Sequence, residues 1–283
     1  MEDKTEVDIK ELTPFKDVNE ISRFFTSGTI LLFKENLVGI YLAGSLSYGA
    51  FHYERSDIDL AIILENPISC LELEAIKSFH KQIETKFNKW AKRLECTYTP
   101  IEMLPSILPP EKPRPWYWGG EGILYEEAPY GNEWIINNYL LYNYAIPLVG
   151  HNFKELTNPI DIEEVQKACI RDLFTEWEPK IANKDWLDDS HNESYFILNL
   201  CRILYTVMRK SAGSKDTATS WVKSKYVAWA DLINSADQWH EGTKLNVREK
   251  TIEFLGFVID QVSKTEIFHQ MHDEINNIRP QHA

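Results

Sequence analysis

The sequence lacks the features of three large classes of protein. Its apolar runs, of which Leu60–Leu64 is among the longest, are far shorter than the roughly 20 residues that a membrane-spanning helix needs. The four cysteines are scattered over 283 residues, without the close spacing of a zinc, redox or disulfide framework, and we expect buried thiols. Lysine and arginine number 30 against 43 acidic residues, whereas nucleic-acid-binding proteins usually present a basic face. We therefore expect neither a membrane nor a nucleic acid as partner.

The net charge of -13 favours a cationic partner. An acidic protein attracts cations, so a polycationic small molecule is a natural ligand, although acidic residues also serve solubility alone. The first residues, Met1-Glu2-Asp3-Lys4, are charged and show no signal-peptide pattern. Scattered thiols suit a reducing compartment. We expect a cytoplasmic monomer.

Hydrophobic periodicity predicts an α+β protein in two parts. In the first part, the pattern predicts helices over 18–34 and 71–90 and strands over 37–43, 57–64 and 94–99, and the proline-rich stretch 105–120 is predicted as loop and turn. From residue 134 onward, it predicts helices over 134–144, 162–177, 195–208, 217–236 and 247–262, without strands. We expect a domain with a small mixed sheet over 1–151, a helical bundle over 152–283, and an active site in the cleft between them.

Two carboxylates stand at the start of a predicted strand. Asp57 and Asp59 are separated by one residue, and side chains alternate along a strand, so we expect both on one face while Ile58 and Leu60 face the core. Carboxylates held side by side repel each other unless a cation lies between them. Mg²⁺ is the expected cation, because it prefers oxygen ligands and usually arrives with the phosphates of a nucleotide.

Gly44 and Ser45 end the preceding strand, and Ser45 lies twelve residues before Asp57. Glycine lets the backbone approach a phosphate closely, and the N–H groups of the following turn can bind an anion. The Ser45 hydroxyl can donate to a phosphate oxygen. Because nucleotidyl transfer needs mainly positioning and charge neutralisation, these few parts suffice for it.

Glu95 is a third candidate carboxylate. In the segment Leu94–Tyr98 it alternates with apolar residues, so it lies on the opposite face from them. If this strand pairs beside the strand of Asp59, Glu95 shares a face with the two aspartates. There it can ligate the metal or take the proton from an attacking hydroxyl as general base.

Each of these signals has a plain structural alternative. An Asp-x-Asp pair occurs often in surface strands, a Gly-Ser pair occurs in many turns, and Glu95 also fits an exposed strand carboxylate. Their combination at this spacing, between two apolar strands, is what favours a site.

Two segments resemble known families. Gly44-Ser45 followed by Ser56–Leu60 (SDIDL) resembles the signature of the polymerase-β-like nucleotidyltransferase superfamily. A second segment resembles the C-terminal domain of the aminoglycoside 3''- and 9-adenylyltransferases, which inactivate streptomycin and spectinomycin by adding AMP. That segment comprises Leu198–Thr206 (LNLCRILYT), Ser214–Asp216 (SKD), Ala218 and Trp221.

The resemblance implies roles for the nucleotide-binding residues. Asp57, Asp59 and Glu95 would bind Mg²⁺, and Glu95 would be the catalytic base. Ser45 and Ser56, beside Gly44, would contact the triphosphate of ATP.

Lys215 lies in the Ser-Lys-Asp segment, and the resemblance implies that it reaches the nucleotide phosphates. A lysine is a flexible point charge suited to phosphate. On the residues alone, a solvated lysine at a capped helix start is the competing interpretation.

The acceptor-binding residues are less clear from the sequence. In relatives that modify streptomycin, an aspartate precedes the Leu-x-Leu-x-Arg-x-x-Tyr-Thr helix, and a tryptophan comes from the first domain. The corresponding positions here are Asn192, with Asp189 and Glu193 nearby, and Trp116 or Trp118. Carboxylates and indoles suit an ammonium-rich, hydroxylated ring system, and they equally suit a solvated loop with core tryptophans. The departure from an aspartate leaves streptomycin, spectinomycin and other hydroxylated amines open.

The sequence thus predicts ATP- and Mg²⁺-dependent transfer of AMP to a hydroxyl of an aminoglycoside-type antibiotic, giving resistance. Two alternatives are a nucleotidyltransferase with another acceptor, such as a protein side chain, and a relative that binds a nucleotide without catalysis. Protein-modifying relatives are typically shorter and lack an appended helical domain. A non-catalytic relative has no need of mutually repelling carboxylates.

Overall fold

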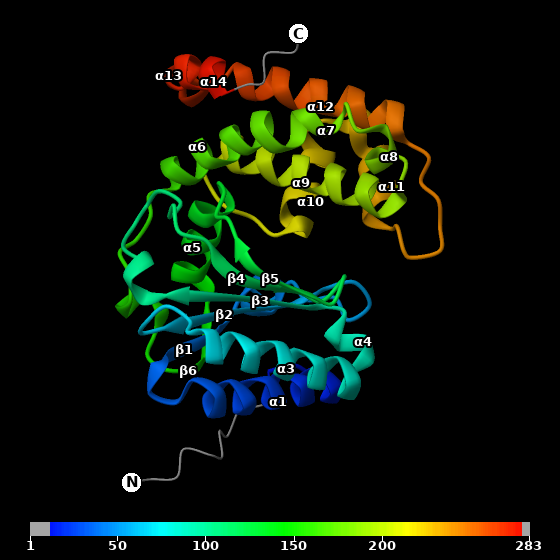
Figure 1. The fold of residues 1–283 in the computed structure, drawn as a ribbon. Helices are drawn as coiled ribbons and strands as arrows, with labels where there is room; N and C mark the ends of the chain where they lie inside the picture. The colour runs from blue at the N-terminus through cyan, green and yellow to red at the C-terminus, as the bar shows by residue number, and fades with distance from the viewer. Residues whose placement is uncertain (1–11, 279–283) are drawn as a thin grey trace. The chain divides into compact units, whose positions relative to one another are not determined.

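The computed structural model describes residues 12–278. Its contacts divide the chain into two compact units, Met1–Pro159 and Ile160–Ala283. The first combines a sheet with helices and the second is helical (Figure 1), which confirms the predicted α+β class. These units are defined by contacts between residues and not by substrate binding. The predicted division into a nucleotidyltransferase domain over 1–151 and a substrate-binding domain over 152–283 therefore stays a prediction.

The strands of the first unit form a six-stranded mixed sheet in the order β5-β4-β3-β2-β1-β6. β2 and β3 run parallel, and the other neighbouring pairs run antiparallel. The strands are β1 (Leu37–Leu42), β2 (Ile58–Leu64), β3 (Leu94–Pro100), β4 (Arg114–Trp118), β5 (Ile123–Ala128) and β6 (Ile146–Val149).

Helices α1 (Lys16–Phe33) and α3 (Cys70–Lys86) lie side by side against one face of the sheet (Figure 1). Ser69 and Glu72 form a capping box that starts α3, and this helix provides the crossover that the parallel strands β2 and β3 require. The remaining helical segments are α2 (Gly44–Ser47), α4 (Asn88–Ala91), α5 (Glu133–Tyr144), η1 (Lys34–Asn36), η2 (Ile101–Met103) and η3 (Phe153–Glu155).

The core of this unit lies between the sheet and these two helices. Alternate residues of the central strands point into it and are fully buried or nearly so: Ile58, Leu60, Ile62, Leu94, Cys96 and Tyr98. They pack with apolar residues of α1 and α3. Because side chains alternate along a strand, the intervening Asp59, Glu95 and Thr97 point to the opposite face of the sheet.

The sequence prediction missed three strands, β4, β5 and β6. The stretch 105–120, predicted as loop and turn, contains β4, which pairs with both β3 and β5. Pro115 is tolerated there because the β4–β5 register shifts between Arg114 and Trp116, and a bulge has no need of the missing N–H. β6 contains Pro147 and lies at the edge of the sheet, where proline is also tolerated.

The second unit is built around α9 (Ser190–Arg209), which packs against α6, α10, α11 and α12. The predicted helix over 217–236 is in fact two α-helices, because the backbone leaves the helical conformation at Tyr226 and a 3-10 turn follows. The rings of Tyr226 and Trp229 pack on Phe257. The other segments are α6 (Ile162–Asp172), the π-helical η4 (Leu173–Trp177), α7 (Glu178–Lys180), α8 (Lys184–Leu187), α10 (Lys215–Lys225), η5 (Val227–Trp229), α11 (Ala230–Asp237), α12 (Arg248–Ser263), α13 (Glu266–Gln270) and α14 (His272–Ile278).

Cys96, Cys169 and Cys201 are buried free thiols as expected, but Cys70 is exposed because it occupies the first turn of α3. Within residues 12–278, none of the helices has the length and apolar character needed to span a bilayer.

A buried histidine lies between α3 and the sheet. His80 is 2% exposed, stacks on the Tyr117 ring with centroids 3.7 Å apart, and shares a 2.8 Å hydrogen bond between its Nε2 and the Tyr98 hydroxyl. Its Nδ1 has no hydrogen-bond partner among the described residues. Burial penalises the imidazolium and lowers the pKa of His80 to about 3.

This histidine should make the protein sensitive to acid. The unfolded chain takes up a proton near pH 6.5, whereas the folded chain does so only near pH 3, so stability is lost as the pH falls through that window. At pH 5 the loss from His80 is about 2 kcal/mol. The His80→Phe variant keeps a stacking ring, and its unfolding free energy, measured with urea, should fall about 2 kcal/mol less between pH 7.5 and pH 5. Equal losses in the two proteins would contradict this assignment.

Candidate active site

The parallel pairing of β2 and β3 brings two of the predicted carboxylates together. Asp59 is the register partner of Glu95, and neighbouring strands lie about 4.8 Å apart, with paired side chains on the same face. Both side chains are partly exposed, so they remain accessible to a ligand. Asp57 is exposed and lies one residue before the first residue of β2.

Gly44 fits against the carboxylate of Asp59. It has a φ of +57°, and a Cβ added at this position would lie 1.7 Å from Asp59 Oδ2. Only glycine can occupy such a position, because any side chain would displace the carboxylate and the backbone is left-handed. The Ala43 N–H donates to the Asp59 carbonyl at 2.9 Å, and α2 then carries Ser45 away from the strand. The Gly44-Ser45 turn is therefore built directly onto the acidic residue.

The chemistry of these donors suits Mg²⁺ better than a softer metal. The paired side chains offer carboxylate oxygens, and Mg²⁺ commonly takes one or two carboxylates and completes its octahedron with phosphates and water. Among residues 12–278, no group of three or more His, Cys, Asp or Glu side chains is arranged to hold a metal ion. The three-carboxylate metal site of Asp57, Asp59 and Glu95 thus stays a prediction.

Ser56 lies in the turn that leads to Asp57. Its Oγ accepts a hydrogen bond from the His52 N–H at 2.9 Å, and its own N–H donates to the His52 carbonyl at 2.8 Å. These bonds close the turn on itself, so Ser56 shapes the approach to the aspartates. Contact of Ser45 and Ser56 with a triphosphate stays a prediction.

Asp17, in the first turn of α1, anchors this turn and was not identified from the sequence. Its Oδ2 accepts hydrogen bonds from the Tyr53 hydroxyl at 2.6 Å and from the Trp90 indole N–H at 2.7 Å. Burial raises the pKa of Asp17, but these hydrogen bonds outweigh it and lower the pKa overall. The partners are 36 and 73 positions away, and no local pattern connects residues so distant.

Arg93, the residue before the first residue of β3, contacts the same turn. Its Nη1 donates to the Tyr53 carbonyl at 2.8 Å, and its Nη2 donates to the Glu54 carbonyl. The carbonyl of Arg93 accepts the N–H of Ile58 at 2.7 Å. Arg93 therefore holds the chain on both sides of Asp57.

An aromatic stack continues the polar face beyond Glu95. Trp118 is the register partner of Glu95. The Trp116 ring lies parallel to that of Trp118, with centroids 6.1 Å apart, and stacks on Tyr125 at 5.2 Å. The structure thus places both predicted tryptophans on the face that carries Glu95, and it adds Tyr125, which the sequence interpretation missed because β5 was missed.

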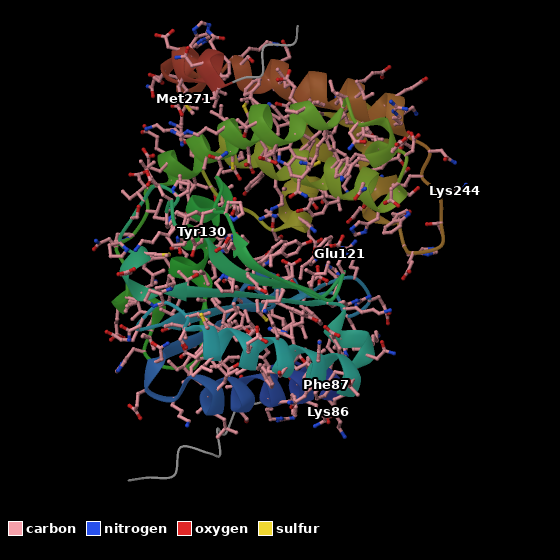
Figure 2. All side chains as sticks on the ribbon, viewed as in Figure 1. Lys86, Phe87, Glu121, Tyr130, Lys244 and Met271 are labelled. Carbon is pink, nitrogen blue, oxygen red and sulfur yellow. The ribbon has the colours of Figure 1, made fainter. Side chains whose placement is uncertain are left out.

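Arg114, the first residue of β4, is buried. Its guanidinium lies 4.0 Å from the ring centroid of Tyr130, which is labelled in Figure 2. Burial lowers the pKa of Arg114, and the nearby Tyr130 and Glu133 oppose that shift.

In the second unit, Lys215 is the first residue of α10. The Ser214 side chain caps this helix by accepting the Thr217 N–H at 3.0 Å. Lys215 is exposed, and its Nζ lies 5.4 Å from the centroid of the Tyr195 ring. The predicted contact of Lys215 with nucleotide phosphates stays a prediction.

The predicted acceptor residues of the second unit shape the start of α9. The Asp189 side chain caps the helix by accepting the Asn192 N–H at 3.0 Å, and Asn192 Nδ2 donates to the Trp186 carbonyl at 3.1 Å. Glu193 is buried, and its Oε1 accepts the Val247 N–H at 3.0 Å. Burial raises the pKa of Glu193, with the backbone N–H groups opposing it. Substrate contact by these three residues stays a prediction.

Comparisons with known proteins address both units. Residues 28–102 match the family model described as nucleotidyltransferase domain, and residues 155–255 match that described as aminoglycoside adenylyltransferase, C-terminal domain. No curated protein matches the chain. A crystal structure of spectinomycin adenyltransferase AAD(9) from Enterococcus faecialis with ATP and spectinomycin matches the fold, with a TM-score of 0.66 and 19% identity over 87% of this chain and 99% of that chain. These matches support the aminoglycoside adenylyltransferase family for this chain and an enzyme of the nucleotidyltransferase class.

Proposed function

We propose that this protein transfers AMP from ATP to a hydroxyl of an aminoglycoside-type antibiotic, either spectinomycin or streptomycin or both, and so gives resistance. The observation that carries the proposal is the register pairing of Asp59 with Glu95 beside the side-chain-free Gly44. The solved relative was crystallised with ATP and spectinomycin, which supports these two substrates. The proposed enzyme would act in the cytoplasm, where ATP is abundant.

In the proposed reaction, Glu95 takes the proton of the acceptor hydroxyl. The resulting oxygen attacks the α-phosphorus of ATP, the bond from that phosphorus to the bridging oxygen breaks, and pyrophosphate leaves. Asp57 and Asp59 would hold Mg²⁺, which when bound neutralises charge on the triphosphate. Ser45 and Ser56 would orient the phosphates, and Lys215 would add a further positive charge from the second unit.

The antibiotic would use the aromatic and acidic side chains. The stacked Trp116 and Trp118 give a flat apolar surface next to the proposed base, and ammonium groups bind well over indole faces. Asp189, Asn192 and Glu193 would contribute polar recognition from the start of α9. The net charge of -13 further favours a polycationic acceptor over an anionic one.

A pyrophosphate-release assay tests the function. With ATP and Mg²⁺, release should require streptomycin or spectinomycin, and mass spectrometry should show the antibiotic carrying one AMP. Aminoglycosides without a suitably placed hydroxyl serve as controls. Release that is independent of every antibiotic, or transfer of AMP to a protein instead, would refute the antibiotic as acceptor.

The Glu95→Gln variant tests the proposed base. The amide keeps the size of the side chain but cannot take a proton, so kcat should fall by about 10²- to 10⁴-fold. ATP binding, measured by calorimetry without antibiotic, should change much less than kcat. Turnover equal to that of the parent enzyme would remove Glu95 from the mechanism.

The Gly44→Ala variant tests the contact with Asp59. The new methyl group would collide with Asp59 Oδ2, so activity should be nearly abolished, and the strained left-handed backbone should cost about 1–2 kcal/mol of stability. Gly49→Ala is the matched control, because Gly49 has a φ of +73° but open space around its Cβ position. Both variants should lose stability in urea unfolding, Gly44→Ala at least as much as Gly49→Ala, while Gly49→Ala keeps its activity. Equal activity of the two variants would contradict a role for the contact.

A further inference from the structure

Asp57 differs from Asp59 and Glu95 in what holds it. The latter two lie within paired strands, whose backbone hydrogen bonds fix their separation. Asp57 lies before the first residue of β2 and is exposed. The turn that precedes it is therefore one of the elements that set its distance from the other carboxylates.

Arg93 is the residue that ties this turn to β3. Its guanidinium bonds the carbonyls of Tyr53 and Glu54, while its backbone carbonyl accepts the N–H of Ile58. Asp57 lies in the segment between Glu54 and Ile58, the residues that Arg93 bonds on either side. Arg93 itself is two residues before Glu95, so a single side chain couples the approach to Asp57 with the strand that carries the proposed base.

A second set of contacts, made by the side chain of Tyr53, also stabilises the turn. The Tyr53 hydroxyl bonds Asp17 at 2.6 Å, and its ring packs on Phe15 with centroids 4.5 Å apart and on Trp90 at 5.3 Å. Lys89 Nζ lies 4.2 Å from the same ring. With the side chain of Tyr53 fixed in this way, the carbonyls that Arg93 bonds are presented in a defined place.

We propose that Arg93 is a positioning residue that sets the place of the Asp57 carboxylate relative to Asp59 and Glu95, and thereby the affinity for the divalent cation that accompanies ATP. This inference rests on the proposed function. A fork of two N–H donors on two successive carbonyls needs a planar guanidinium, which a lysine ammonium does not reproduce. Without the fork, mutual repulsion of the carboxylates favours their separation.

The test compares three variants with the parent enzyme. Arg93→Met removes the fork and the charge, and Arg93→Lys keeps the charge alone. Arg171→Met is the matched control, because Arg171 is also partly buried and forms an ion pair with Glu274 in the second unit. Binding of Mn²⁺ in the presence of a non-hydrolysable ATP analogue is measured by electron paramagnetic resonance, and kcat, KM for ATP and thermal unfolding are measured alongside.

We expect Mn²⁺ binding to weaken by about 10- to 100-fold in Arg93→Met, the range seen for residues that orient metal ligands. The Mn²⁺ affinity of Arg93→Lys should lie between that of Arg93→Met and that of the parent enzyme. The Mg²⁺ concentration for half-maximal activity should rise in the same order, while KM for ATP at saturating Mg²⁺ changes little. Arg171→Met should bind Mn²⁺ as tightly as the parent enzyme does, even if its unfolding temperature falls as much as that of Arg93→Met.

Two results would overturn the inference. One is parental Mn²⁺ affinity in Arg93→Met or, should that variant not fold, in Arg93→Lys. The other is an equal loss of affinity in Arg171→Met, which would mark a general effect of stability. If the parent enzyme itself binds no Mn²⁺ with the nucleotide analogue and releases no pyrophosphate, the proposed function fails as well, so the two failures are distinguishable.

Discussion

The repulsion between Asp59 and Glu95 is the constraint on which the rest of the first unit depends. Their register on parallel strands holds the two carboxylates side by side, at a cost on the order of a few kcal/mol at the roughly 5 Å spacing of strands. Adjacent positions of the same strands supply the compensation, because Ile58, Leu60 and Cys96 are buried against α1 and α3. Burial of these apolar side chains stabilises the sheet enough to keep the acidic pair in place.

The surrounding structure restricts Asp59 and the neighbouring Asp57 by two separate contacts. Gly44 lies so close to the Asp59 carboxylate that any larger residue would displace it, and Arg93 fixes the chain on both sides of Asp57. Such positioning is what nucleotidyl transfer requires of a protein, because the reaction depends on orientation and charge neutralisation more than on covalent chemistry by side chains. Placement on strands rather than on long loops gives the carboxylates the rigidity that this demands.

The sequence interpretation missed three strands, and two of them contain proline. Pro115 lies in a stretch predicted as loop, and Pro147 lies in a segment with no strand prediction. One lies at a register shift and the other on an edge strand, and in both places the missing N–H is harmless. The omission of β4 and β5 mattered for the site, because β4 places Trp118 beside Glu95 and β5 adds Tyr125 to the stack. The sequence could name the tryptophans as candidates, but only strand pairing showed that they share a face with the carboxylate.

The sequence by itself determined the α+β class, the central strands and the identity of the acidic residues, because alternation along a strand and helical periodicity are local properties of the chain. Tertiary structure decided which carboxylates are neighbours, why position 44 must be glycine, and how Asp17 and Arg93 hold a turn far from them in sequence. These features arise from strand register and from contacts between distant residues. Such contacts are set by the packing of the whole core, and they leave no periodic trace in the amino-acid sequence.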